Sequence, residues 1–353
     1  MNKNELIQQI EYFTGEKKYG EIITSLERYG YVATPEIDEK LEQIFSQIDD
    51  DRAIAELCLK MKFSPSSRGG VFAAGALASI NKPKVIPHVI DALVTGWGFS
   101  TSINGVRLNK LVSMIIKSIG VPAVEPLFQE LEKPPRGIKL WGFVVNILNE
   151  IAAQVILNET ATQECSAILA KYLESGRRNI SETAAAILRK LDWQPKNDRQ
   201  RTLFLIATHS SDELIAIGEP AVDELTRVLR NFKESRTPSV SLIKTLGAIG
   251  NPGPVDLLIE MLSINYVTGS KIRDEVVRAL GQIRDPRAIR PILDHYKNAK
   301  FLSRAKKKTC ADALMNIASR HRDEVKMALA DDHKRIKKVA KLVLKAFDKT
   351  PSS

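Results

Sequence analysis

The hydrophobic runs of this chain repeatedly end in the same kind of turn. In ALGQIRDPRAIRPIL (279–293), an apolar run stops at a turn that contains Asp285 and Pro286, and a second apolar run follows. Apolar residues three and four positions apart lie on one face of a helix. Proline suits the first position of a helix, and an aspartate before it accepts hydrogen bonds from the free N–H groups. The pattern therefore predicts two helices joined by a capped turn, and it favours a structural role for Asp285 and Arg287 over an acid and a base.

The same turn recurs along the chain. IFSQIDDDRAI (44–54) aligns with ALGQIRDPRAI without a gap, and TLGAIGNPGPVDLLIEML (245–262) and ALASINKPKVIPHVIDAL (76–93) have the same form. If the last apolar residue before each turn is taken as an anchor, successive anchors lie 26 to 40 residues apart, which is enough for two helices and two turns. The sequence predicts a repeat of helical pairs. The anchors are Ile48, Ile80, Ile119, Ile151, Leu191, Ile217, Ile249, Ile283 and Ile317.

These units resemble HEAT repeats, in particular the subgroup first associated with phycobilisome lyases, over roughly residues 36–330. The resemblance implies an all-α fold, a right-handed α-α superhelix of about eight helical pairs with capping helices. It also implies a concave surface that is usually lined by the second helix of each pair. We expect residues 1–34 to form N-terminal capping helices, residues 35–330 the HEAT-like repeats, and residues 331–353 a basic C-terminal capping helix.

Small residues stand two positions before several anchors. Gly247 and Gly281 occupy this place in two repeats, and Ala78 and Ser46 occupy it in two others. A small side chain allows two helices to come close together. The pattern predicts that the paired helices approach each other closely at these positions.

Composition supports a helical protein. Aromatic residues make up only 6% of the chain, while Ala, Leu, Ile, Lys and Glu, which favour helices, are abundant, so we expect little or no strand. No segment approaches the roughly 20 uninterrupted apolar residues of a membrane span, and the N-terminus lacks a signal-peptide pattern. These features predict a cytoplasmic protein. Cys58, Cys165 and Cys310 lie in apolar helical patterns, which predicts buried free thiols.

The net charge of +10 comes from the C-terminal end. Residues 297–353 contain 16 Lys and Arg against 6 Asp and Glu. Their lysines could give the closing helix a polar outer face and suit the negative end of its dipole. Alternatively they form a basic surface for phosphate or for an acidic partner. The candidate binding residues of this surface are Arg304, Lys306, Lys307, Lys308, Lys337, Lys338 and Lys341.

Two further features are candidates for binding. Trp97 and Phe99 lie in a loop, TGWGFSTSING (95–105), where aromatic side chains either bind a partner or fold back over the neighbouring helix. Basic residues also recur just after the turns, where they either form a ladder along the stack or pair with neighbouring acids. These residues are Arg52, Lys84 and Arg287, with His321 at the matching place.

No pattern predicts an enzyme. The chain contains no phosphate loop, GxSxG elbow, HExxH helix or Rossmann glycine signature. Deoxyhypusine hydroxylase, which is built from similar repeats, holds two irons with repeated His-Glu pairs, and this sequence has no such pair. We therefore predict no metal, no cofactor and no catalytic residue.

The sequence favours a non-catalytic scaffold or adaptor that binds another protein along its curved surface. The alternative is a nucleic-acid-binding protein that uses the basic C-terminal quarter. A third hypothesis is a factor for a prosthetic group, similar to phycobilin lyases, which would require a deep apolar pocket. The first two hypotheses differ in whether the C-terminal lysines share a face with the scaffold surface.

Overall fold

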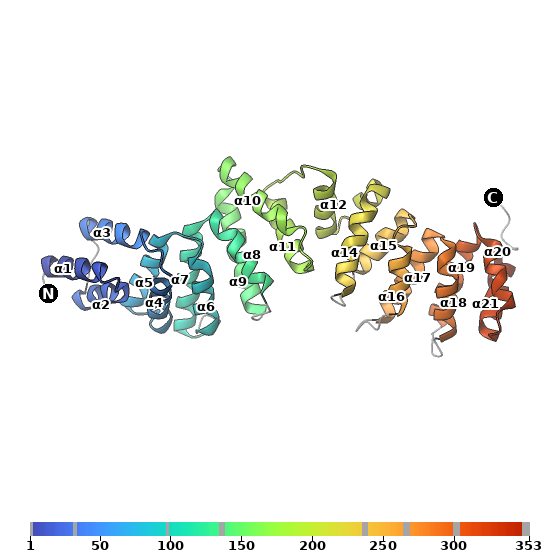
Figure 1. Ribbon diagram of the computed structural model, residues 1–353, viewed down its shortest axis with the longest axis horizontal. Helices are drawn as coiled ribbons and strands as arrows, with labels where there is room; N and C mark the ends of the chain where they lie inside the picture. The colour runs from blue at the N-terminus through green and yellow to red at the C-terminus, as the bar shows by residue number, and fades with distance from the viewer. Residues whose placement is uncertain are drawn as a thin grey trace. The chain divides into compact units, whose positions relative to one another are not determined.

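The computed structural model describes residues 3–30, 34–96, 99–133, 138–234, 239–263, 269–298 and 304–347. All regular structure in these ranges is helical (Figure 1), so the predicted all-α fold of helical repeats is confirmed. The chain divides into two compact units, and α11 (Arg178–Lys190) is shared between them. Unit 1 is Met1–Tyr172 with Ala186–Trp193, and unit 2 is Leu173–Ala185 with Gln194–Ser353.

Helices joined by short turns build unit 1, in the order that the sequence pattern predicts (Figure 1). They are α1 (Lys3–Gly15), α2 (Tyr19–Tyr29), α3 (Pro35–Ser46), α4 (Asp51–Phe63), α5 (Arg68–Ile80), α6 (Val85–Thr95), α7 (Ile103–Ile119), η1 (Val121–Ala123), α8 (Val124–Glu132), α9 (Ile138–Val155) and α10 (Glu159–Tyr172).

Unit 2 continues the same alternation of helices and turns. Its elements are α12 (Asp198–Ala207), α13 (Ser211–Ile217), η2 (Glu219–Ala221), α14 (Val222–Glu234), α15 (Val240–Ile249), α16 (Val255–Ser263), α17 (Gly269–Ile283), η3 (Pro286–Ala288), α18 (Ile289–Asn298), α19 (Arg304–Ala318), α20 (Arg322–Met327), η4 (Ala328–Ala330) and α21 (Lys334–Phe347).

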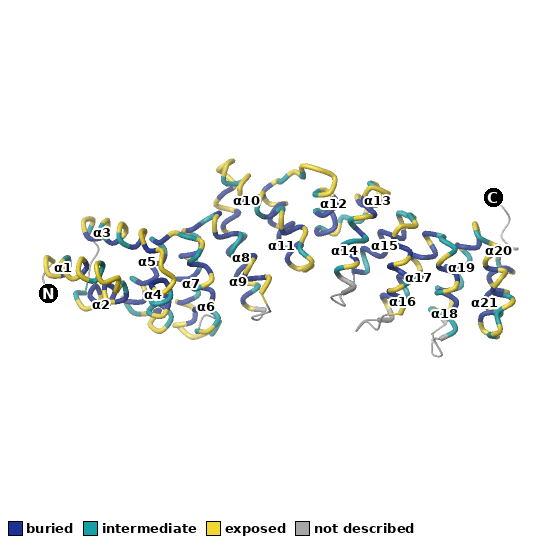
Figure 2. The backbone as a smooth tube through the Cα atoms, in the orientation of Figure 1, coloured by how far each residue is buried: buried dark blue, intermediate teal, exposed yellow. Residues whose placement is uncertain are grey.

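Within each unit the helices form two layers. Helices that precede the turns pack side by side, and we call them the first-helix layer: α3, α5, α7 and α9 in unit 1, and α13, α15, α17 and α19 in unit 2, where α21 continues the row. Helices that follow the turns form the second-helix layer, such as α4, α6 and α8 in unit 1. Figure 2 shows the buried positions along the helices of both layers, where the core lies.

The anchors belong to this core. Five of them end a first helix, whereas Ile48 and Leu191 lie just after α3 and α11, and Ile151 lies inside α9, which continues to Val155, so Ile151 does not mark a turn. Ile217 and Ile249 are partly buried against the core cluster of unit 2. The other anchors, namely Ile48, Ile80, Ile119, Ile151, Leu191, Ile283 and Ile317, are buried.

The turns are capped as the sequence predicts. The Asp285 carboxylate accepts a hydrogen bond from the Arg287 backbone N–H at 2.9 Å, and Pro286 opens the helical turn η3. Asn251 accepts one from the Gly253 N–H at 2.8 Å. These side chains satisfy N–H groups that have no partner within the helix. Asp285 is thus a cap, which confirms its structural interpretation.

Gly247 and Gly281 bring first helices of successive repeats together. A Cβ atom on Gly247 would lie 2.7 Å from the Cα atom of Ala279 in α17, and one on Gly281 would lie 2.6 Å from the Cα atom of Ala313 in α19. The predicted close approach is therefore confirmed, but it joins first helices of successive repeats and not the two helices of one pair. The small residues serve contacts between neighbouring repeats, because that is where two helix backbones nearly touch.

The three cysteines are buried free thiols, as predicted. Burial raises the thiol pKa to about 12 in Cys58, about 11 in Cys165 and about 12 in Cys310. At neutral pH these groups stay protonated and act as small apolar side chains.

No single helix of the described residues is long and apolar enough to span a membrane. Among the helices that the structure describes, one pair, Ile103–Ile119 and Val121–Glu132, has the combined length and apolar composition of a span, but it is bent by 114°.

Candidate binding grooves

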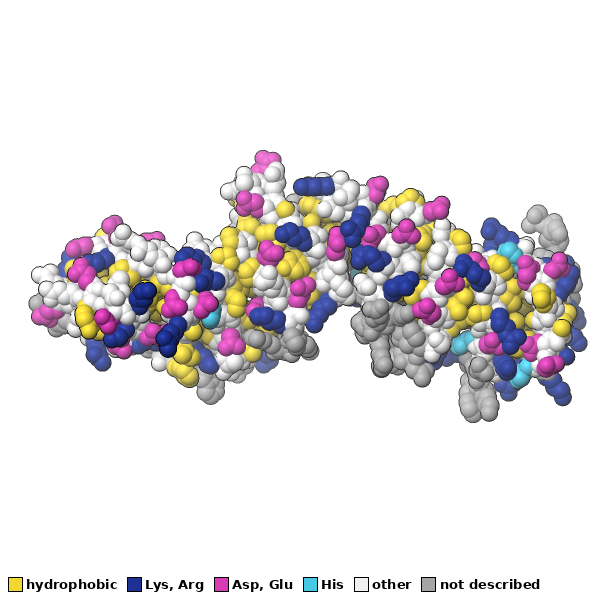
Figure 3. All heavy atoms as spheres, viewed as in Figure 1, with side chains coloured by type: hydrophobic (Ala, Val, Ile, Leu, Met, Phe, Trp, Pro, Cys, Tyr) yellow, Lys and Arg dark blue, Asp and Glu magenta, His cyan; other side chains and the backbone are white. Residues whose placement is uncertain are grey.

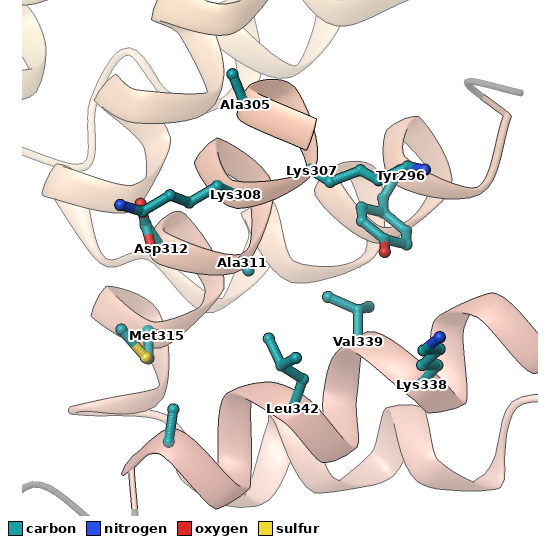
Figure 4. Close-up of a pocket in the computed structure, with 11 residues that line it drawn as sticks. Tyr296, Ala305, Lys307, Lys308, Ala311, Asp312, Met315, Lys338, Val339 and Leu342 are labelled. Atoms are coloured by element: carbon teal, nitrogen blue, oxygen red, sulfur yellow. The ribbon is translucent and has the colours of Figure 1, made fainter. Parts of the chain in front are cut away.

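The last two helices of the first-helix layer enclose an open groove of about 640 Å³, which we call the C-terminal groove (Figure 4). Its walls are α19 and α21, and Tyr296 of α18 closes one end. Of the predicted basic residues, Lys307, Lys308 and Lys338 line it. Its other lining residues, which the sequence analysis did not single out, are Tyr296, Ala305, Ala311, Asp312, Met315, Val339, Leu342 and Ala346.

One end of this groove is basic, and apolar side chains lie toward the other. Figure 4 shows Lys307 and Lys338 near Tyr296 at the first end, and Met315 toward the second, on the side where the side chains of Lys308 and Asp312 also lie. Leu342 lies between them and is 56% exposed, although it belongs to a helix whose other large apolar residues are mostly buried. In Figure 3 basic side chains and hydrophobic ones lie side by side at this end of unit 2. The groove therefore combines charge with an uncovered apolar surface.

The lysines lie at the helix ends that suit them least. Lys307 and Lys308 fall near the start of α19, and Lys337 and Lys338 near the start of α21; neither helix has an acid in its first turn. Helix N-termini carry partial positive charge, so lysines there oppose helix stability. The expectation that the lysines of the last helix suit the negative end of its dipole holds for Lys345 in the last turn and is wrong for Lys337 and Lys338.

The other basic candidates of this region lie outside the groove lining. Lys306 and Lys337 are half-buried, and Lys341 is exposed on α21. Arg304 begins α19, but its side chain lies outside the described residues. Thus the structure brings together Lys307, Lys308 and Lys338 in the lining of one groove on the first-helix layer, and the other candidates do not line it.

A second open groove, of about 1180 Å³, lies on the first-helix layer of unit 1, and we call it the α7–α9 groove. Phe99 lines it: its ring packs edge-on against Phe143 of α9 at a centroid distance of 6.3 Å, and its carbonyl accepts a hydrogen bond from Lys139 Nζ at 3.1 Å. The Phe99 ring therefore folds over the neighbouring helix and still faces the groove. Trp97 lies outside the described residues.

Uncovered apolar side chains face the α7–α9 groove. Val106 is 61% exposed, Val71 43% and Met114 42%. Lys117 and Glu150, which also line the groove, form an ion pair of 2.8 Å between α7 and α9. Both grooves lie on helices that precede the turns, so the expectation that second helices line the binding surface does not describe them.

The basic residues after the turns join neighbouring repeats. Arg287 Nη1 donates to both Asp256 oxygens at 3.0 Å, and its Nη2 donates to the Pro252 carbonyl at 3.1 Å and to Asp285 at 2.9 Å. Lys84 donates to the Asp49 carbonyl at 2.6 Å and pairs with the carboxylates of Asp49 and Asp51. Lys84 and Arg287 therefore bridge to the preceding repeat. Arg52 is exposed, and His321 contacts Glu324.

The Asp285 carboxylate predicts a dependence of stability on pH. Its hydrogen bond with Arg287 holds its pKa below the usual 3.8. Because the pKa is lowered in the folded state, the carboxylate stabilises the protein fully above pH 3.8, and this stabilisation is lost as the pH falls through the folded-state pKa. We expect Asp285→Ala to lower the unfolding free energy of unit 2 by about 1 kcal/mol at pH 7.

Urea unfolding of the wild type and of Asp285→Ala at pH 7 and at pH 3 measures this effect. The difference between the two proteins should shrink at the lower pH. Asp285→Asn is the control, because it keeps a capping oxygen and removes only the charge. A difference that is the same at both pH values would contradict the role of the carboxylate charge.

Three of the five histidines each contact a single carboxylate. His209 Nε2 lies 2.8 Å from Glu182, His321 Nδ1 lies 3.2 Å from Glu324, and His88 lies 3.7 Å from Asp51. The fold thus brings two His–Glu pairs into contact, although the two residues of each pair are not adjacent in the sequence. Within the part of the chain that the structure describes, no group of three or more His, Cys, Asp or Glu could hold a metal ion.

The stacked pairs, the capped turns and the open grooves define a helical-repeat protein. Residues 272–298, which form most of α17 and all of η3 and α18, match the family model of the PBS lyase HEAT-like repeat. The resemblance that the sequence carries is therefore confirmed for this repeat. No curated protein matches the chain.

Several solved structures are similar at low sequence identity. Human deoxyhypusine hydroxylase in complex with glycerol is 14% identical, with 90% of this chain and 100% of that chain covered and a TM-score of 0.27. Importin beta is 14% identical, with 98% and 60% covered and a TM-score of 0.25. A chain from a structure of the interaction between cadherin and beta-catenin is 12% identical, with 98% and 79% covered and a TM-score of 0.23. At such TM-scores these chains say nothing about the function of this one.

Proposed function

We propose that this protein is a non-catalytic scaffold that binds another protein through its first-helix layer. The observation that carries this proposal is the α7–α9 groove, where Val71, Val106 and Met114 expose apolar surface side by side with polar residues. Contiguous exposed apolar surface with a polar rim is typical of protein interaction sites. Leu342 and Met315 give the C-terminal groove the same character.

The architecture supports a binding role on physical grounds. In a repeat stack each helical pair contacts only its neighbours, so the outer surface of a layer is free for a partner. Ion pairs such as Lys84 with Asp49 and Arg287 with Asp256 hold adjacent repeats together. They leave the first-helix layer uncovered, because these contacts lie at the turns. A partner can therefore bind without disturbing the core.

Site-specific photo-cross-linking tests the scaffold function. We expect Met114→p-benzoylphenylalanine, introduced into the full chain and illuminated in a lysate of the source cells, to give a discrete adduct with a protein. Gln129→p-benzoylphenylalanine is the matched control, because Gln129 is exposed on α8 in the second-helix layer. Adducts of the same proteins at both positions, or none at Met114, would contradict the proposal.

The captured protein then allows a quantitative test. Its affinity for the wild type is compared with that for a chain carrying Val106→Glu and Met114→Glu. Charges placed in an apolar interface cost at least 1.4 kcal/mol, so we expect a loss of affinity of about tenfold or more.

A further inference from the structure

The walls of the C-terminal groove are two strips of residues at helical spacing. Lys307, Ala311 and Met315 follow each other four residues apart on α19, and Lys338, Leu342 and Ala346 do the same on α21. Each strip begins with lysine and ends with apolar side chains. At 1.5 Å per residue, eight residues span about 12 Å, which is about two turns of a bound helix. The groove therefore has the size of a short peptide segment and a defined polarity.

The lysines of this groove differ from the basic residues at the turns, because they have no ion-pair partner in the part of the chain that the structure describes. Lys84 and Arg287 each contact carboxylates of neighbouring turns and helices. Among the described residues, by contrast, no carboxylate forms an ion pair with Lys307, Lys308 or Lys338. Asp312 is the acid in the lining, so the lining has an excess of two positive charges.

Other groups at this end of unit 2 add positive charge. Both walls start at helix N-termini without an acid in the first turn. The basic end of the groove is therefore a region of positive potential that an anionic group of a ligand would neutralise.

We propose that the C-terminal groove binds a short amphipathic helix of a partner protein, with carboxylates at the end that meets Lys307 and Lys338 and large apolar side chains on Met315 and Leu342. This inference rests on the scaffold function and names the chemistry of one of its partners. The apolar half distinguishes this occupant from a nucleic acid, whose phosphates call for cations along the whole site. Val339, only 3% exposed, forms the apolar floor beneath it.

Fluorescence anisotropy with synthetic peptides and the full chain tests the proposal. The probe is a labelled 16-residue helical peptide with glutamates in its first two turns and leucines along one face of the rest. In one control peptide lysines replace the glutamates, and in the other serines replace the leucines. We expect only the first peptide to bind at about 0.15 M salt, because binding needs both charge and apolar contact.

Variants of the chain locate the binding site. We expect Lys338→Glu to weaken binding of the acidic peptide about fivefold and Lys307→Glu with Lys338→Glu at least about tenfold. Lys341→Glu is the matched control, because it makes the same charge change on the same helix but outside the groove lining. It should change the affinity less than twofold, because salt screens its charge from the bound peptide. Leu342→Ser should also weaken binding, whereas Met327→Ser, at another exposed apolar residue, should not.

Three results would overturn the proposal. One is that the three peptides bind equally well, or that no peptide binds. Another is a Lys341→Glu effect as large as that of Lys338→Glu. The third is displacement of the peptide by duplex DNA or single-stranded RNA at this salt concentration, which would assign the lysines to nucleic acid. If the peptide fails while Met114 still cross-links a protein, the scaffold function stands and only the proposal for the C-terminal groove is wrong.

Discussion

Replacing Gly281 by leucine is expected to lower the free energy of unfolding of unit 2 by about 3 kcal/mol. A Cβ atom at this position would lie 2.6 Å from the Cα atom and 2.7 Å from the Cβ atom of Ala313. Neither atom can rotate away, so α17 and α19 would have to move apart. Leucine is a better helix former than glycine by nearly 1 kcal/mol, and the loss measured is therefore smaller than the cost of the clash itself.

Gly75→Leu is the matched control for this experiment. Gly75 also lies within a first helix, α5, but an added Cβ atom would meet nothing within 4 Å. We expect this substitution to leave stability unchanged or raised by up to about 1 kcal/mol. Urea unfolding followed by circular dichroism gives both values, and hydrogen exchange shows whether α17 and α19 lose protection. A loss in Gly281→Leu no greater than in Gly75→Leu would show that the helices have room to adjust.

The sequence predicts the repeats well because their signals are local. The proline that follows five of the nine anchors, and the capping residue before it in some of them, depend only on a few adjacent positions, and Asp285 and Asn251 do cap their turns. The partner of a small residue is not local. Gly247 meets Ala279 in the following repeat, 32 positions away, and no pattern within one turn identifies that neighbour. The position was therefore predictable, whereas the contact was not.

The grooves were predictable only in part, since they depend on which surfaces the stack leaves uncovered. Lysine content identified Lys307, Lys308 and Lys338, but it did not separate them from Lys341, which lies outside the groove lining. Tyr296 and Met315 gave no signal, because apolar residues in a helix are usually core. Leu342 carried a usable signal: Ile336, Val339, Ala340 and Val343 define the buried face of α21, and Leu342 falls outside it. A leucine on a lysine-rich helix face indicates an exposed apolar side chain that a partner could cover.

The ion pairs at the turns also lay beyond sequence analysis. The matching places of Lys84 and Arg287 could indicate a ladder for a ligand or bonds between repeats. The structure gives both residues carboxylate partners from neighbouring turns and helices. A cation that already has several partners gains little from a new anion, because its charge is already neutralised. The lysines of the C-terminal groove, which form no ion pair with any described residue, are better candidates for binding for the same reason.

The largest loss of stability is expected for Phe128→Ala, at about 4 kcal/mol in unit 1. Phe128 is fully buried on α8, and its ring stacks on that of Tyr172 with centroids 4.3 Å apart and planes inclined by 22°. Removing the ring leaves a cavity between α8 and α10 and deprives Tyr172 of its stacking partner. This contact joins two helices of the second-helix layer, where no glycine brings the backbones together.

Two milder variants separate the contributions of this contact. Phe128→Leu keeps most of the apolar volume and should cost less than about 2 kcal/mol. Tyr172→Phe keeps the stacking but removes the hydroxyl, which donates to the Glu125 carbonyl at 3.2 Å, so it should cost about 1 kcal/mol. Urea unfolding gives all three values. If Phe128→Ala costs no more than Phe128→Leu, the apolar volume that leucine keeps contributes nothing, and the predicted cost of a cavity between α8 and α10 is wrong.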